Sequence, residues 1–167
     1  HNPLATLMLG GQEGQIIHLL SRQPADAATV FSTKVLTVFL SAYYPLACAT
    51  FGIHMPSGNF VPGIVIGASS GRLIGELLQQ EGLAGEWTPG AFALIGAAAV
   101  LSSMTRMSLT LAAILIEVAK DVRLMPATML SLTVARVVGN LICNSFDEEM
   151  MAADSLPFLD DSPPEHL

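Results

Sequence analysis

The chain alternates between apolar runs and short breaks that carry proline, glycine or charge. The longest uninterrupted run is Phe31–Gly52, 22 residues that include one charge, Lys34. A membrane-spanning helix needs about 20 apolar residues, so this run is the best candidate for one. Lys34 lies near its start, where a lysine amine reaches the membrane interface.

The other apolar runs are shorter or interrupted. They predict helices over residues 16–20, 60–78, 91–104, 107–119 and 124–143. Short and broken apolar helices are typical of transporters whose helix breaks line an ion site. Irregular backbone survives at membrane depth only where protein or an aqueous cavity covers it. The alternative is the core of a soluble helical protein, which would need polar outer faces that these segments largely lack.

Composition supports the membrane interpretation. Of the 167 residues, 51% are hydrophobic and 13% are charged, whereas about 25% are charged in a typical soluble domain. So apolar a chain is not intrinsically disordered.

The net charge of −7 is confined to the end of the chain. Residues 1–146 carry seven acidic and seven basic side chains, and the other seven acids follow with no base among them. We therefore divide the chain into a neutral membrane body, 1–146, and an acidic tail or linker, 147–167. The absence of a basic stripe argues against nucleic acid as a partner.

Cysteine and histidine point to no special chemistry. Cys48 and Cys143 lie in apolar runs, and we expect two buried free thiols rather than a disulfide. The histidines are scattered without metal-ligand spacing, at His1, His18, His54 and His166. No nucleophile and base are paired in the sequence. We expect no metal, no catalytic residues and no enzyme activity.

Four glycines recur at every fourth position, at Gly63, Gly67, Gly71 and Gly75. Residues four apart share one face of a helix, so these glycines form a smooth groove. In a membrane such a groove lets a second helix approach closely. No Gly-Lys-Ser/Thr follows the glycines and no strand precedes them, which excludes a phosphate-binding P-loop.

A helix is expected to start near Phe60, between Gly58 and Pro62. Glycine permits an unusual backbone angle before the helix, and proline is tolerated in a first turn. The exposed N–H groups and positive dipole of a helix start favour an anion. The local residues leave two interpretations open, an anion site and an ordinary capped helix start.

These residues also carry a resemblance to a known family. Gly58, Phe60 and Pro62 match the G-x-F-x-P signature of the CLC chloride channel and transporter family. Further similar segments are 2–7, 66–76, 91–99, 105–111, 135–139 and 156–159. The likeness covers nearly the whole chain and is closest in style to the intracellular members, the lysosomal and plant vacuolar types.

The resemblance implies an all-α, multi-pass integral membrane protein in an intracellular membrane. The chain would be the second half of an inverted-repeat fold with short, broken and tilted helices. Segments 107–119 and 124–143 would help to form a homodimer in which each subunit has its own pore. The tail would lead toward cytosolic CBS domains that the chain lacks.

The resemblance also assigns a chloride site. In the family, backbone amides of the two residues after the signature glycine bind the central ion, and these are Asn59 and Phe60 here. The wider set around the ion would be Gly58, Asn59, Phe60, Val61 and Pro62. No cofactor is implied beyond the transported chloride.

One expected side chain is missing from that site. The family usually places a tyrosine hydroxyl on the anion after the last long helix. An ungapped match puts Asp147 there, and one inserted residue puts Phe146 there. A carboxylate repels an anion and phenylalanine has no donor, so we expect a weakened site or loose proton coupling.

The expected function is chloride transport by a voltage-gated channel or a chloride/proton antiporter, with protons as a second partner in the antiporter. The family's G-S-G-I-P and G-[KR]-E-G-P loops and its proton-relay glutamate belong to the first half and do not occur here. The alternative is a non-conducting fragment or splice form that acts as an assembly or regulatory partner. Glu117 and Arg136 lie inside apolar runs, where we expect pairing between packed helices or a direct role in the ion path.

Overall fold

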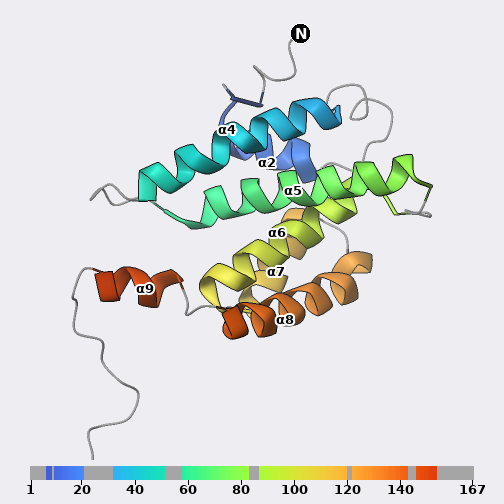
Figure 1. Ribbon diagram of the computed structural model, residues 1–167. Helices are drawn as coiled ribbons and strands as arrows, with labels where there is room; N and C mark the ends of the chain where they lie inside the picture. Colours follow the sequence, from blue (N-terminus) through green and yellow to red (C-terminus); the bar gives the residue numbers. More distant parts are fainter. Residues whose placement is uncertain are drawn as a thin grey trace, which may run out of the picture.

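A computed structural model describes residues 7–8, 10–20, 32–51, 58–82, 87–119, 122–142 and 146–153. The regular elements in these ranges are all helical (Figure 1). They are α2 (Gln12–Leu20), α4 (Thr33–Phe51), α5 (Phe60–Gln80), α6 (Pro89–Thr105), α7 (Leu109–Ala119), a 3₁₀ turn (Val122–Leu124), α8 (Met125–Ile142) and α9 (Phe146–Ala153).

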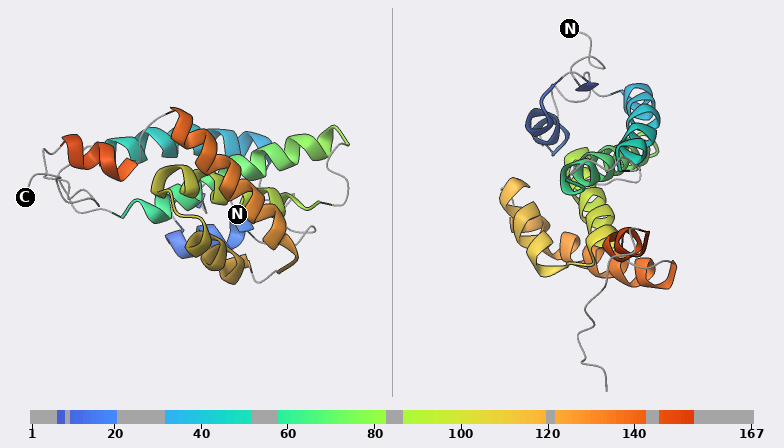
Figure 2. Two further views of the ribbon diagram at one scale, coloured as in Figure 1. Left: turned by 90° about the horizontal axis from the view of Figure 1, so that it is seen from below. Right: turned by 90° about the vertical axis from the view of Figure 1, so that its left-hand side faces the viewer.

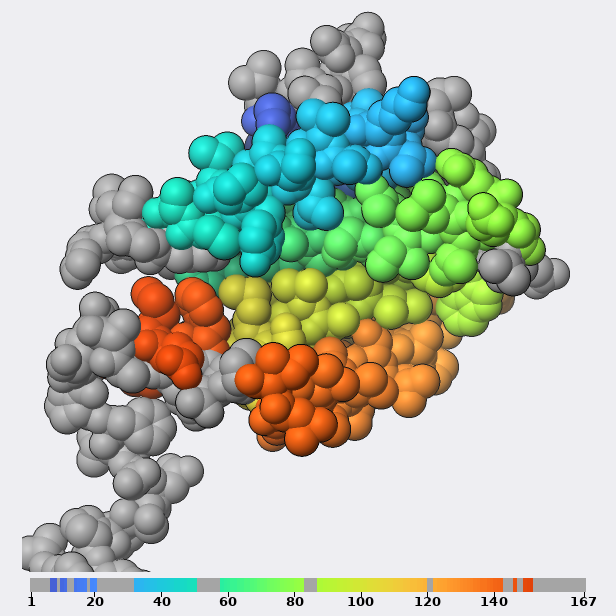
Figure 3. Space-filling model, in the orientation of Figure 1, coloured from blue at the N-terminus to red at the C-terminus, as the bar shows by residue number. Residues whose placement is uncertain are grey.

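Helices α5 and α6 form the centre of the molecule and make its most extensive helix–helix contact. α2 and α4 pack on the outer side of α5, and α7 and α8 pack on α6 (Figures 1 and 2). In the space-filling view α5 is held between α4 and α6, and α9 lies against the end of α6 (Figure 3).

The glycine groove is where α5 meets α6. A Cβ atom added at Gly67 would lie 2.6 Å from the Cα of Ala97, and one added at Gly71 would lie 2.2 Å from the carbonyl oxygen of Phe92. The two backbones are therefore in direct contact, as small residues allow between apolar helices.

The buried surface of α6 consists mainly of small and aliphatic side chains. Its buried residues include Ala93, Ala97 and Ala98 as well as Leu94 and Leu101. This helix contacts α5, α7 and α8 together, which explains why its sequence lacks a polar face.

Two serine hydroxyls join α6 to α8 in opposite directions. Ser102 Oγ donates to the carbonyl oxygen of Leu132 at 2.8 Å, and Ser131 Oγ donates to that of Ile95 at 3.1 Å. Hydroxyls that donate to backbone carbonyls remain satisfied inside an apolar interface.

The outer faces of the later helices are apolar and exposed. On α8 the exposed apolar side chains include Leu130, Val134, Val137, Val138, Leu141 and Ile142. In the described part of the chain, two helical segments are long and apolar enough to cross a membrane, Phe60–Gln80 and Val122–Ile142. Lipid or another protein surface would cover such a face.

Helix α4 lies within Phe31–Gly52, the run that is the best membrane-spanning candidate from the sequence, and both ends of that run lie outside the described residues. The helix has 19 residues but is not among the two qualifying segments.

The prediction that Cys48 is buried is wrong. Its thiol is free and exposed. α4 turns Leu36, Phe39 and Ala47 inward, and Cys48, one residue beyond Ala47, is rotated by about 100° toward the outside. Cys143 lies outside the described residues.

The structure also differs from the expectations for Glu117, for Arg136 and for the acidic tail. Glu117 on α7 and Arg136 on α8 are exposed, and no ion pair joins either of them to another described residue. Their pairing between packed helices is therefore not found, because both helices turn these positions outward. The acidic tail, expected to be a linker, begins with the helix α9.

Candidate anion site at the start of α5

The first turn of α5 presents backbone donors that the helix does not use. The Gly63 N–H donates to the carbonyl oxygen of Asn59 at 3.1 Å and so closes the first helical turn. Pro62 has no N–H, so the amides of Phe60 and Val61 precede the first helical hydrogen bond. These two amides lie at the positive end of the helix dipole.

Nothing on the helix itself competes for this end. The Asn59 side chain makes no capping hydrogen bond, and the first turn of α5 holds no acidic residue. An anion at this position would therefore meet donors and no like charge within the turn.

Gly58 departs from the sequence expectation. It was expected to adopt an unusual backbone angle, but in the described residues positive φ occurs at Arg106 and at Gly82. A Cβ atom added at Gly58 would meet nothing within 4 Å. Neither backbone conformation nor packing in the described structure requires glycine here.

The structure brings other predicted site elements to the same end of the bundle. A Cβ atom at Gly63 would lie 3.1 Å from Leu101 and 3.4 Å from the sulfur of Met104, so the end of α6 lies beside the start of α5. α9 also contacts α6, and Figure 1 shows it at this end. Phe146 is half-buried at its start, and the Asp147 side chain lies outside the described structure.

A buried polar network at the other end of α5 was missed by sequence reasoning. Arg72 is 3% exposed and donates through an Nη atom to the carbonyl oxygen of Leu19 at 2.7 Å. Its Nε lies 3.9 Å from Glu76 Oε1. Thr33 Oγ1 donates to Glu76 Oε2 at 3.3 Å.

This network joins three helices, since Leu19 lies in the last turn of α2, Thr33 begins α4, and Arg72 and Glu76 belong to α5. The available signal was the pair of opposite charges four residues apart inside an apolar run, which share a helix face.

The chain is similar to known proteins over its whole length. The sequence profile described as "Voltage gated chloride channel" matches residues 3–140. The chain belongs to the voltage-gated chloride channel family. It is 34% identical to chloride channel protein CLC-d of Arabidopsis thaliana over 167 residues, which is 100% of this chain and 21% of that protein.

Other family members give the same picture. Identity to the human H(+)/Cl(-) exchange transporter 7 is 32% over 160 residues, or 95% of this chain and 19% of that protein. Identity to Arabidopsis CLC-c is 32% over 161 residues, or 96% of this chain and 20% of that protein. The chain thus spans about a fifth of the length of the curated relatives it matches. The family resemblance drawn from the signature residues is confirmed.

Proposed function

We propose that this chain takes part in chloride transport, either as a voltage-gated channel or as a chloride/proton antiporter. It would be a multi-pass protein of an intracellular membrane and would supply the second half of the inverted-repeat fold. Relatives named as chloride channels and as H(+)/Cl(-) exchange transporters support this proposal.

The observation that carries the proposal is the uncapped start of α5. Chloride would be held by the amides of Asn59 and Phe60, with Gly58, Val61 and Pro62 completing the turn. Amide dipoles replace the water around the ion without a full positive charge, so the ion can leave again. The absence of an acid from this turn favours the same use.

The open space at Gly58 is consistent with an anion that approaches the backbone at this position. Glycine allows a ligand to come close to the backbone, and no described atom fills the position of its missing side chain. An ion that approaches the amide of Asn59 would use this space.

Replacing a single amide by an ester tests the site directly. An ester in place of the amide at Phe60 removes one N–H donor while the side chain remains. We expect chloride affinity to fall about tenfold, since a hydrogen bond to a charged group contributes about 1.5–3 kcal/mol.

The matched control is an ester at Leu109, the corresponding first residue of α7. It removes an equivalent N–H that also lies ahead of its helix's first bond, from Ala112 to Ser108. Unchanged chloride affinity in the Phe60 ester, or an equal fall in both esters, would exclude the α5 site.

A second candidate function rests on the exposed apolar faces. α7 and α8 leave Leu109, Ile114, Leu130 and Leu141 uncovered. A non-conducting assembly or regulatory partner would use these faces to bind other subunits, and a transporter would use them as its homodimer interface. Chloride flux from vesicles separates the two when the chain is joined to the first half of the fold, because a transporter half then conducts and an assembly partner does not.

A further inference from the structure

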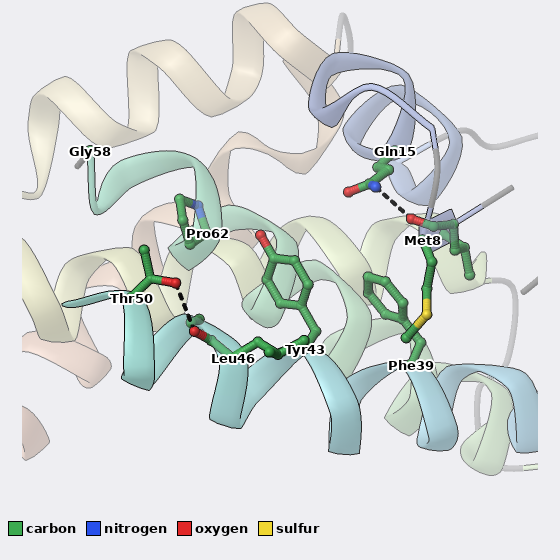
Figure 4. Close-up of a pocket in the computed structure, with 10 residues that line it drawn as sticks. Met8, Gln15, Phe39, Tyr43, Leu46, Thr50, Gly58 and Pro62 are labelled. Carbon is green, nitrogen blue, oxygen red and sulfur yellow. Dashed lines mark hydrogen bonds between the residues drawn. The ribbon is translucent and has the colours of Figure 1, made fainter. Parts of the chain in front are cut away.

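A cavity of about 350 Å³ lies between α2, α4 and the first turn of α5 (Figure 4). One wall is aromatic, since the rings of Phe39 and Tyr43 stack with centroids 5.3 Å apart. Leu46 and Ala47 continue this wall along α4, and Pro62 lines the side formed by α5. The cavity is within the size range of small-molecule sites.

One buried acceptor in this cavity has no partner. Gln15 is 7% exposed, and its Oε1 makes no hydrogen bond within the described part of the chain. Its Nε2 donates to the carbonyl oxygens of Leu7 and Gly10, which fixes the amide, because a flipped amide would set Oε1 against two acceptors. Figure 4 shows the oxygen turned into the space between α2 and Tyr43.

The described lining of the cavity offers no charge to a ligand. None of the described residues that line it is acidic or basic, so a charged ligand would lose its hydration without compensation from them. Thr50 Oγ1 already donates to the carbonyl oxygen of Leu46 at 2.8 Å. The polar groups left for a ligand are the Gln15 oxygen and the Tyr43 hydroxyl.

Water alone fits this surface poorly. The volume would accommodate about ten molecules, and each buried water needs two to four polar partners. Two polar groups among apolar walls satisfy few of them. A molecule with one hydroxyl and a hydrocarbon body matches both parts of the surface.

We infer that the cavity binds a neutral amphiphile whose hydroxyl donates to Gln15 Oε1 and whose hydrocarbon part packs on Phe39 and Tyr43. The ligand class is a medium-chain alcohol or a neutral lipid with a free hydroxyl. The inference does not rest on chloride transport, since no anion takes part in it.

Photolabelling tests the site. The protein in lipid vesicles is exposed to octanol that carries a photoreactive diazirine, and the labelled residues are located by mass spectrometry. We expect the label on the cavity lining, at Tyr43 or Met8. Excess octanol should compete about five- to tenfold better than octane, because octane cannot donate to the Gln15 oxygen. The Gln15→Leu variant should lose this preference.

A second pair of variants tests the cavity without touching Gln15. Ala47→Phe fills the cavity, since Ala47 is buried in its wall. Ala49→Phe places the same side chain on the exposed face of α4. We expect labelling of the lining to fall at least fivefold in Ala47→Phe and to stay unchanged in Ala49→Phe.

Three results would overturn the inference. The first is labelling that Ala47→Phe does not reduce. The second is equal competition by octane and octanol, which would remove the hydrogen bond to Gln15. The third is a label spread evenly over exposed apolar helix faces, with no excess at the cavity, which would indicate partition into lipid only.

Discussion

Gly71 on α5 and Gly96 on α6 lie backbone against backbone at the centre of the molecule. A Cβ atom added at Gly96 would lie 2.7 Å from the Cα of Gly71, and one added at Gly71 would lie 3.0 Å from the Cα of Gly96. Any side chain at either position must push the two helices apart. The proposed anion site lies at the start of α5, and α8 packs on α6. The contact between the two glycines therefore sets the distance between α5 and the helices that pack on α6.

We expect Gly71→Ala to destabilise the protein by about 1–3 kcal/mol. The new Cβ would meet the Phe92 carbonyl oxygen at 2.2 Å, and such overpacking outweighs the better helix propensity of alanine. The free energy of unfolding can be measured from helical ellipticity during titration with denaturing detergent.

The control for this variant is Gly14→Ala on α2, where an added Cβ meets nothing within 4 Å. Here propensity alone acts, and the variant should be as stable as the parent or more stable by up to about 1 kcal/mol. Equal stability of the two variants would contradict direct backbone contact between α5 and α6.

Removing Arg72 should loosen the network that joins three helices. Arg72→Met keeps much of the side-chain length but loses the hydrogen bond to Leu19 and leaves Glu76 without its cation. Breaking a buried pair on one side costs about 3–5 kcal/mol. We expect a loss near the lower figure, measured by the same detergent titration.

Two further variants make this prediction specific. Arg136→Met, at an exposed position, should change stability by no more than about 0.5 kcal/mol. Adding Glu76→Gln to Arg72→Met should restore part of the loss, because no carboxylate is then left unpaired. If the double variant is no more stable than Arg72→Met, the interaction with Glu76 is unimportant.

Gly58→Ala separates binding from folding. The position is open, so we expect the free energy of unfolding to change by less than about 0.5 kcal/mol. If chloride approaches through this space, its affinity should fall several-fold, as measured by chloride binding to the purified protein. A large loss of stability would show that Gly58 serves the fold instead.

Restoring a hydroxyl near the start of α9 should strengthen the proposed chloride site. We expect Phe146→Tyr or Asp147→Tyr, made in a form that transports chloride, to raise chloride affinity, since tyrosine adds an O–H donor. The Asp147 change also removes a negative charge. Halide affinity equal to the parent in both variants would argue against a weakened central site.

Local features of the sequence predict the class of the protein and most of its helices. Periodic glycines, low charge and the signature between Gly58 and Pro62 are local features, and they predicted the start of α5 at Phe60 and the apolar segments up to residue 143. The signature also led to the family that the profile match confirms. These features can be predicted from the sequence because helix starts and apolar segments depend on residues close together in the chain.

Which helix faces are covered depends on packing between segments that are distant in the sequence. Cys48 and Ala47 are neighbours in one apolar run, yet one is exposed and the other buried. Arg72 lies in one apolar run and is 3% exposed, whereas Arg136 lies in a similar run and is exposed. Apolar membrane helices lack the polar face that would indicate their orientation, so contacts between distant segments determine it.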